Sequence, residues 1–439
     1  MGTQLAGDIG HFRPLEEVRE PTFAKALVIQ AEGCKLVLIQ LDAFGLTTRW
    51  ANLIREAVAE KIGTEPSSVM VCGTQNHGTP CLGDFGVYAS GQYIPADLSW
   101  LSVGDEAYAR IVVERAVAAA LQANAALEPV TSGASSLTDG RLSFNRRFIL
   151  RDGTVKSHPP DCSETIRFCE GPIDPEVGVA CLRAGNGKVI AALLHFTCHP
   201  NHGYPHRFLT SDWPGAWSSQ VPSLLGPQCV PLVLNGFCGN IHHHNHLDRH
   251  HVDDYHRMGR LLAETTEQIL PRIEYSDSAG LAVESRHVPL PYRRLDPEKM
   301  REVRGLLARN PQPIWLNDEC TRVSWDWMYA VSLLDLEADI GVSSTYPYEV
   351  QVMRLGDIGL VFAGGEPFVE GQLQIKMNSP ARQTYVAHMA NDACGYIPTA
   401  AAFPRGGYET NVWQWSKFAP EALERIVATA TEMLHSVFA

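Results

Sequence analysis

Residues 188–200 read KVIAALLHFTCHP, an apolar run that ends in a histidine and a proline. A continuous run of Val, Ile, Ala and Leu predicts a strand that is buried on both faces of a sheet. Pro200 stops the strand, so His199 is expected at its carboxyl end, where turns present side chains to a cleft. The stretch therefore predicts a sheet buried beneath helices, with a candidate site at one end of its strands.

Strand-like and helix-like segments alternate through the first third of the chain. Residues 24–30 (AKALVIQ) and 34–42 (CKLVLIQLD) have the composition of buried strands. Residues 49–62 predict a helix that Gly63 can end. Residues 105–127 have apolar side chains three and four positions apart, which also predicts a helix. This order predicts an α/β fold in which mixed, buried β-sheets are flanked by helices.

The rest of the chain continues in the same way. Further elements are expected as strands at 177–184 and 229–240 and as helices at 255–270 and 420–438. Residues 349–366 predict a hairpin that turns at Gly356 and Asp357, whereas the pattern of residues 323–340 is ambiguous. No internal repeat or obvious linker divides the sequence. Residues 1–439 are therefore expected to form one catalytic domain.

Composition limits the classes of partner. A formal net charge of −13 over 439 residues disfavours nucleic acids and anionic membrane surfaces. The first ten residues have neither the basic stretch nor the apolar core of a signal peptide, and no apolar run reaches membrane-spanning length. Eleven cysteines, mostly inside apolar runs, predict reduced thiols in the cytoplasm. A small-molecule substrate is the expected partner, and a homo-oligomer is left open.

Two more polar residues resemble His199 in their position. Glu366 follows a glycine pair after the strand-like run of residues 355–363, and Tyr396 lies in the segment CGYIP. A carboxylate at the end of a buried strand carries a large desolvation cost unless it is paired or bound to a metal. A histidine, a carboxylate and a phenol from three distant segments predict a metal site, and zinc accepts imidazole and carboxylate ligands.

Other candidates lie in two polar segments. Gln75 and His77 are two residues apart in GTQNHGTP, so in an extended segment they face the same side. Six histidines fall between His242 and His251. Such a run can bind metal or buffer protons, and it can also be an ordinary polar loop. A single histidine in either segment is as consistent with a plain hydrogen bond as with a ligand role.

The order of several short motifs resembles that of a known family. The motifs are GTQNHGTP, FNRR, LLHFTCHP followed by SDWPG, NGFCGN, GGEPF and GYIPTAAAFPRGGYE. Together they resemble the neutral/alkaline (non-lysosomal) ceramidase family of zinc-dependent amide hydrolases, over about residues 5–435. The resemblance implies a ceramidase catalytic-domain-like fold. It also implies that His199, Glu366 and Tyr396 bind zinc, and that Tyr408, Arg146 and His77 belong to the active site.

Two positions depart from the family pattern. Gln75 stands where the family has a zinc-binding histidine, and His242 stands where it has a serine. The amide oxygen of glutamine is neutral and hard, which makes it a poor zinc ligand. The expected cofactor is therefore zinc or another divalent metal, with Gln75, His77 or the run from His242 to His244 completing the ligand set. His242 is also a candidate catalytic residue. The family's ceramide-cleaving members also carry a C-terminal β-sandwich domain, and none is expected here.

These observations predict a metal-dependent hydrolase that cleaves an amide or related bond in a soluble polar substrate. The metal would polarise the substrate carbonyl and activate water. His77 would take the proton from that water, and Tyr408 and Arg146 would stabilise the oxyanion. A histidine base also predicts a limb of the pH–rate profile near ~6–7.

Two alternative functions stay open on the sequence. The first is a carbohydrate-active enzyme on the same fold, working by glycoside cleavage or β-elimination. Four tryptophans near the motifs would suit a sugar, although tryptophan is also good core material: Trp213, Trp217, Trp413 and Trp415. The second is a non-catalytic binding protein that has lost the metal together with the histidine that Gln75 replaces.

Overall fold

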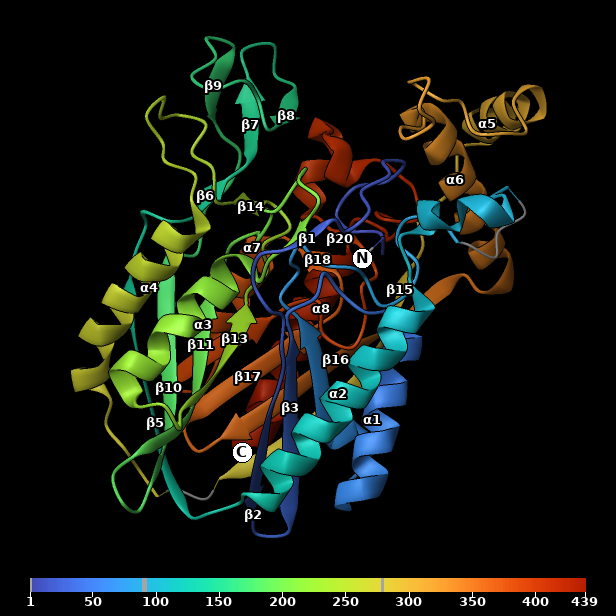
Figure 1. Ribbon diagram of the computed structural model, residues 1–439. Coiled ribbons are helices and arrows are strands. Elements are labelled where there is room, and N and C mark those ends of the chain that lie inside the picture. Colours follow the sequence, from blue (N-terminus) through green and yellow to red (C-terminus); the bar gives the residue numbers. More distant parts are fainter. Residues whose placement is uncertain (1, 89–92, 278–279) are drawn as a thin grey trace.

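The computed structural model describes residues 2–88, 93–277 and 280–439. Three larger β-sheets lie at its centre (Figure 1). The first orders β2 (Ala24–Ala31), β3 (Cys34–Leu41) and β4 (Val69–Gly73). The second orders β13 (Val230–Asn235), β11 (Val189–Phe196), β10 (Glu176–Ala184) and β5 (Val130–Thr138). The third orders β15 (Leu281–Pro291), β16 (Thr345–Leu355), β17 (Ile358–Ala363) and β19 (Gln383–Ala387).

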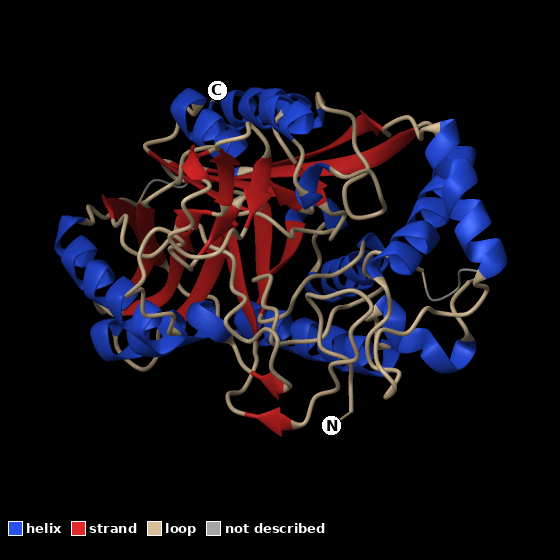
Figure 2. Ribbon diagram, turned by 90° about the horizontal axis from the view of Figure 1, so that it is seen from above, coloured by secondary structure: helices blue, strands red, loops and turns tan. Residues whose placement is uncertain are grey.

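The three sheets share one hydrophobic cluster, to which Leu38, Leu193 and Leu360 each contribute from a different sheet. Helices cover the outer faces, so that strands lie in the middle and helices around them (Figure 2). The first sheet is covered by α1 (Thr48–Ile62) and α2 (Glu106–Ala125), the second by α3 (Asp212–Leu225) and α4 (Tyr255–Ile269), and the third by α7 (Val369–Asn378) and α8 (Ala422–Phe438). The predicted fold class, mixed buried sheets flanked by helices, is confirmed.

Local sequence signals explain several element boundaries. Gly63 ends α1 in the left-handed conformation, with φ of 70°, which a residue without Cβ adopts readily. The Asp105 carboxylate caps α2 by accepting a hydrogen bond from the Tyr108 amide. The hairpin of β16 and β17 turns at Gly356 and Asp357, as predicted. The ambiguous segment at 323–340 is mostly a helix, α6 (Trp325–Val342).

Short pairs of strands lie at the ends of the large sheets. They join β1 (Glu17–Val18) to β12 (Phe208–Leu209), β6 (Phe144–Asn145) to β14 (Ile241–His242), and β18 (Glu366–Pro367) to β20 (Tyr396–Ile397). A small separate sheet orders β8 (Val155–Ser157), β7 (Arg147–Leu150) and β9 (Ile166–Cys169). Figure 1 shows β14, β18 and β20 together in the upper half of the molecule. They lie where the candidate residues gather.

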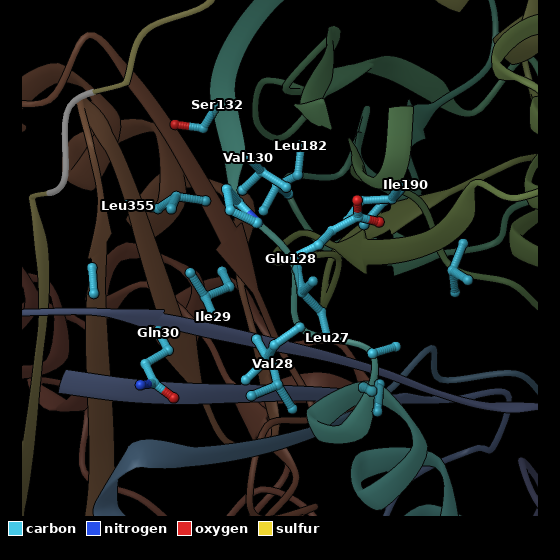
Figure 3. Close-up of a pocket in the computed structure, with 18 of the residues that line it drawn as sticks. Leu27, Val28, Ile29, Gln30, Glu128, Val130, Ser132, Leu182, Ile190 and Leu355 are labelled. Atoms are coloured by element: carbon cyan, nitrogen blue, oxygen red, sulfur yellow. The ribbon is translucent and has the colours of Figure 1, made fainter. Parts of the chain in front are cut away.

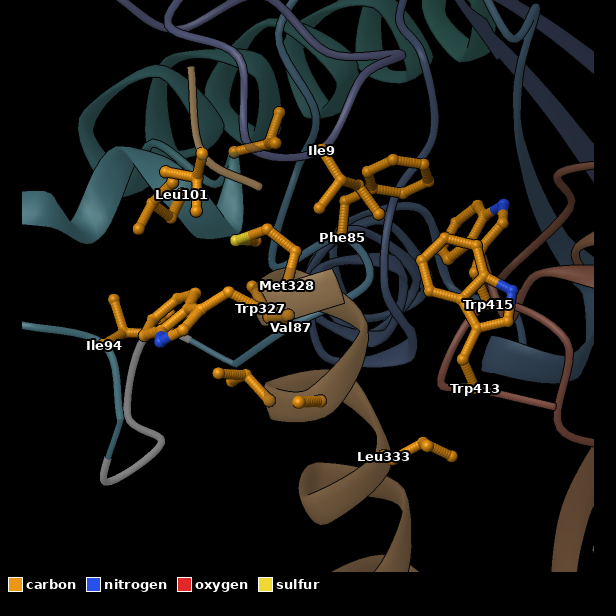
Figure 4. Close-up of a cluster of buried hydrophobic side chains, with 14 of the residues drawn as sticks. Ile9, Phe85, Val87, Ile94, Leu101, Trp327, Met328, Leu333, Trp413 and Trp415 are labelled. Atoms are coloured by element: carbon orange, nitrogen blue, oxygen red, sulfur yellow. The ribbon is translucent and has the colours of Figure 1, made fainter. Parts of the chain in front are cut away.

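A second hydrophobic cluster supports that end of the molecule. Ile9, Phe85 and Trp415 gather there beside α6 (Figure 4). The cluster also takes in side chains of α5 (Pro297–Arg309). It joins the N-terminal segment to the C-terminal third of the chain. Within the described ranges, no helix is both long enough and apolar enough to cross a bilayer.

Candidate active site

The candidate residues follow the carboxyl ends of strands in all three sheets. Gln75 and His77 follow β4, which runs parallel to β3. His199 follows β11, which runs parallel to β13. Glu366 follows β17, which runs parallel to β19. Ligands of open α/β sheets bind outside the carboxyl ends of strands, and this edge therefore brings together residues that are distant in sequence.

His199 and Glu366 form the centre of this group. The His199 Nε2 atom lies 3.6 Å from Glu366 Oε2, and both side chains are only 1% exposed. His199 Nδ1 lies 3.2 Å from the Cys238 carbonyl oxygen. That oxygen can only accept, so Nδ1 carries the hydrogen and Nε2 keeps its lone pair. The lone pair is directed at the glutamate, in the arrangement that a metal between the two residues requires.

Glu366 is held on one side and has no partner on the other. Its Oε1 accepts a hydrogen bond from Trp415 Nε1 at 2.5 Å, while Oε2 has no hydrogen-bond partner among the described residues. Burial raises the pKa of Glu366 to about 7. Tyr396 is the register partner of Glu366 in the β18–β20 pair, and burial raises the pKa of its phenol well above the usual value. An unsatisfied buried carboxylate oxygen of this kind marks a place where another positive group belongs.

Gln75 reaches the same point from a strained backbone. Its φ is +68°, a left-handed conformation that is uncommon for a residue other than glycine. Its side-chain amide lies between two neighbours. On one side, the oxygen position is 2.9 Å from His388 Nε2 and 3.1 Å from the Cys238 sulfur. On the other side, the nitrogen position faces Glu366 and has no acceptor in good hydrogen-bond geometry among the described residues.

The tautomer of His388 decides how the Gln75 amide is oriented. His388 Nδ1 lies 2.9 Å from the carbonyl oxygen of Asn235 and must donate to it. Burial lowers the pKa of His388 to about 4, so the ring is neutral and Nε2 is an acceptor. The group of Gln75 next to Nε2 is therefore the NH₂, an assignment that rests on the hydrogen-bond network. This orientation turns the Gln75 carbonyl oxygen towards Glu366.

The residues present thus fit a divalent metal. With the amide oriented by His388, a Gln75 oxygen, a Glu366 oxygen and the His199 Nε2 lone pair all point to one buried place. Such atoms repel one another unless a cation, or a proton on the carboxylate, lies among them. Tyr396 adds a phenol oxygen to the set. The set contains more oxygen than the histidine-rich sites that zinc prefers, so a harder metal such as manganese is also compatible with it.

His77 is buried beside this group and is suited to accept a proton. Its ring centroid lies 5.0 Å from that of His199, and its Nε2 atom has no hydrogen-bond partner among the described residues. Burial, followed by the charge of Arg13, lowers the pKa of His77 to about 3. The imidazole is therefore neutral at neutral pH. The expected limb near pH 6–7 is wrong for this residue, because desolvation moves its titration far to the acid side.

Arg146 and Tyr408 lie on the other side of Tyr396. The Arg146 guanidinium carbon is 5.5 Å from the Tyr396 ring centroid and 5.4 Å from that of Tyr408. The two tyrosine rings meet edge to face at 5.7 Å. Burial disfavours the charge of Arg146, but Tyr408, Tyr396 and Glu409 outweigh it and raise its pKa well above the usual value. The site therefore contains a fixed positive charge and two phenols beside the candidate metal ligands.

His242 lies nearby but in a different group of contacts. Its ring stacks on His243 at 4.1 Å and meets His158 edge to face at 4.5 Å. Its Nδ1 atom accepts a hydrogen bond from the His244 amide. Burial lowers the pKa of His242 well below the usual value, and the charges of neighbouring residues, Arg146 and His199 among them, contribute. Its role as a catalytic residue or additional ligand stays a prediction.

The N-terminal segment covers the site. The backbone of Gly7 lies against His77 so closely that a Cβ added there would be 2.1 Å from His77 Nδ1. The buried guanidinium of Arg13 anchors the segment, since it donates to the carbonyl oxygens of Ala6 and His206, both at 2.8 Å. Only glycine allows this approach, because φ at Gly7 is also +94°. The segment thus forms one wall of the site.

The cavities and tryptophans do not favour a sugar. A cavity of about 720 Å³ lies at the other end of β11, lined by side chains such as Leu27, Val130 and Ile190 and by none of the candidate residues (Figure 3). The four tryptophans that suggested a carbohydrate are between 0% and 4% exposed. They pack in hydrophobic clusters, and of the four only Trp415 borders another described cavity, of about 610 Å³, which Trp50 also lines.

We expect His388 to control metal affinity through Gln75. In His388→Asn the amide can keep the bond to Asn235 but no longer reaches Gln75, so metal affinity should fall by roughly 10–100-fold. His388→Gln, which places an amide near the Nε2 position, should lose less. Calorimetric titration with zinc and manganese measures both values. Equal affinities for the wild type and the Asn variant would contradict the assignment.

Comparisons with known proteins agree with the geometry at the level of the fold. No protein-family model matches the chain, and no curated protein matches it. The crystal structure of neutral ceramidase from Pseudomonas aeruginosa covers 100% of this chain and 72% of its own, with a TM-score of 0.71 and 17% sequence identity. The structure of a ceramidase complexed with C2 covers 99% of this chain and 74% of its own, with a TM-score of 0.65 and 15% identity. The chain therefore has the fold of neutral ceramidase, and the resemblance read from its motifs is confirmed at that level.

Proposed function

We propose that this chain, whose fold is that of neutral ceramidase, is a metal-dependent hydrolase that cleaves an amide or related acyl bond in a soluble polar substrate. The observation that carries the proposal is the meeting of His199 Nε2 and Glu366 Oε2 at 3.6 Å, with a neutral His77 beside them. A hydrolase needs an electrophilic centre and a base within reach of the same water, and this arrangement supplies positions for both.

His199, Glu366, Tyr396 and Gln75 would hold the metal. When bound, a divalent ion supplies Lewis-acid activation of a carbonyl and of water. The residues of the chain do the rest. Neutral His77 accepts the proton of the attacking water at Nε2, which is the ring nitrogen without a partner. Arg146 and the Tyr408 hydroxyl stabilise the negative charge that develops on the substrate oxygen, in a buried setting where such interactions are strong.

The substrate is proposed to be small and polar. The site lies beneath the N-terminal segment, and its metal-ligand candidates are buried. A net charge of −13 also disfavours approach to anionic membrane surfaces, where the chain would meet lipid substrates. A small substrate suits a site whose candidate residues are buried in this way.

A substrate panel tests the proposal. Chelator-treated protein is reconstituted with zinc or manganese and assayed on soluble N-acyl amides, esters and glycosides beside micellar ceramide. We expect metal-dependent turnover of a soluble amide or ester, and little turnover of ceramide. If ceramide is the best substrate by a wide margin, the proposed substrate class is wrong. Glycoside cleavage would contradict the proposed bond. Absence of bound metal, with no turnover restored by divalent ions, would favour a binding protein that has lost the metal.

A further inference from the structure

A second group of metal-ligand side chains lies outside the candidate active site. We propose that His202, His243 and Asp253 bind a divalent first-row transition-metal ion. One ligand atom from each residue lies within 4.8 Å of the other two. His202 lies in the loop after β11, whereas His243 and Asp253 lie in the loop between β14 and α4 (Figure 1). None of the three belongs to the metal set proposed for the active site.

The two imidazole rings face the same carboxylate oxygen. Asp253 Oδ1 lies 2.5 Å from His243 Nδ1 and 3.2 Å from His202 Nε2. The rings are stacked, with centroids 3.5 Å apart and 16° between their planes. Bonds of about 2.0–2.2 Å from a metal to nitrogen and oxygen require ligand atoms spaced about 3 Å apart. The three ligand atoms lie near this spacing, and the nearly parallel rings would have to tilt apart for both in-plane nitrogens to reach one ion.

The opposite side of each ring is held by an acceptor. His202 Nδ1 lies 2.7 Å from the buried carboxylate of Asp212, and His243 Nε2 lies 2.6 Å from the side-chain oxygen of Asn201. Bonds of this kind behind a metal-binding histidine fix its tautomer and its ring orientation. They place the hydrogen on the outer nitrogen of each ring. Burial lowers the pKa of His202, but Asp212 and Asp253 outweigh it and raise the pKa to about 9, so without an ion the inner nitrogen of His202 carries a proton that it donates to Asp253.

This arrangement is unfavourable without a positive charge at its centre. In the metal-free protein the proton on His202 supplies this charge, and a bound metal ion would supply it in place of that proton. Asp212 itself is fully buried and adopts a φ of +52°, so strain is accepted to hold it behind His202. The hydrogen-bond acceptors behind both histidines distinguish the group from a chance cluster of charged side chains on the surface.

The two-histidine, one-carboxylate set leaves coordination positions open, a pattern used for iron, zinc and related metals. Asp253 is 38% exposed, so the ion can enter from solvent. An ion bound there would link the loop of residues 243–254, between β14 and α4, to the segment that follows His199. That segment also supports the active site, because the Pro200 carbonyl accepts a hydrogen bond from the His77 amide at 3.0 Å. The metal would thus act as a clamp beside the active site.

Metal stoichiometry in matched variants tests the assignment. Chelator-treated protein is titrated calorimetrically with zinc and with cobalt(II), and metal content after desalting is measured by elemental analysis. The Glu366→Gln variant lacks the charged ligand of the active-site set, so any metal ion that it still binds tightly must lie at another site. We expect Glu366→Gln to bind one equivalent. Adding His243→Ala or Asp253→Asn should weaken that binding at least ~100-fold, whereas His250→Ala, in the same loop but outside the group, should not change it.

Each other outcome overturns the proposal. No tight equivalent in Glu366→Gln, with circular dichroism showing a folded protein, would mean that protons alone occupy the group. An equivalent lost in Asp161→Asn but kept in His243→Ala would move the ion to the neighbouring group of Asp161, His244 and His246. Failure of the active-site proposal gives a different pattern, because wild type and Glu366→Gln would then bind the same single equivalent.

Discussion

Replacing Glu366 by glutamine should lower turnover by roughly 10²–10³-fold. It should also lower the metal affinity of the active site by more than ~10–100-fold, which is the loss expected when a residue that only supports a metal ligand is removed. The substitution keeps the shape of the side chain and an oxygen that can accept the Trp415 hydrogen bond. It removes the charge that a metal needs. The measurements are kcat on the best panel substrate and calorimetric metal affinity. Wild-type turnover in this variant would rule out Glu366 as a ligand.

The same variant should be at least as stable as the wild type when no metal is present. Burial raises the pKa of Glu366 from 4.5 to about 7, so the folded protein binds this proton more tightly than the unfolded chain does. The contribution of this group to stability is therefore complete below pH 4.5. It is lost as the pH rises through about 7, by roughly 3 kcal/mol in all. Glu366→Gln removes this pH dependence.

A matched control is available four residues along the chain, in α7. Glu370 is half-buried with a raised pKa, and its carboxylate accepts a hydrogen bond from the Asn240 side-chain amide at 2.9 Å. It does not contact the candidate ligands in the described structure. Glu370→Gln should therefore keep metal affinity and turnover near the wild-type values. Equal losses in both variants would indicate a general effect of removing buried charge.

Replacing Glu409 by glutamine should destabilise the protein by about 3–5 kcal/mol. Glu409 is fully buried and pairs with two buried arginines, at 3.2 Å from Arg146 Nε and 2.6 Å from Arg147 Nη1. Ser157 donates to the same carboxylate at 2.8 Å. Without the charge, Arg147 keeps Glu170 but Arg146 has no carboxylate left among the described residues. An uncompensated buried cation is costly, and urea unfolding measures the loss.

An exposed ion pair supplies the comparison. Arg304 and Glu337 lie 2.6 Å apart on the surface, with side chains 51% and 41% exposed. Glu337→Gln should change the free energy of unfolding by less than about 1 kcal/mol. The turnover of Glu409→Gln is a second measurement, because Arg146 also faces Tyr396 and Tyr408 in the candidate active site. A stability loss below about 1 kcal/mol for Glu409→Gln would show that the buried network carries little of the stability.

The sequence predicted the part of the site that local patterns encode. An apolar run that ends in a polar residue and a turn located His199, Glu366 and Tyr396, because a buried strand can expose only its last residue to a cleft. The same pattern exists in residues 383–388, QTYVAH, and it could have located His388. The sheet fold and its hairpin followed from similar signals of apolar composition and turn residues.

The remaining features depend on contacts between distant segments. Arg146 and Arg147 resemble surface charges in sequence, since nothing nearby reveals that Glu409 lies between them. The orientation of the Gln75 amide is set by His388, 313 residues away. The contacts of His242 follow from the pairing of β14 with β6, which directs its ring towards His158. Local sequence carries no information about such pairings, and for that reason they could not be predicted.

The spread of the candidate ligands over three sheets has a consequence for folding. Gln75, His199, Glu366 and Tyr396 approach one another only after all three sheets have docked, and contacts of such high sequence separation form slowly. No early intermediate holds a complete set of donors. Metal capture would therefore be a late event in folding. From then on the bound ion would stabilise only the fully assembled chain, so a limited supply of metal would lower the amount of mature protein as well as its activity.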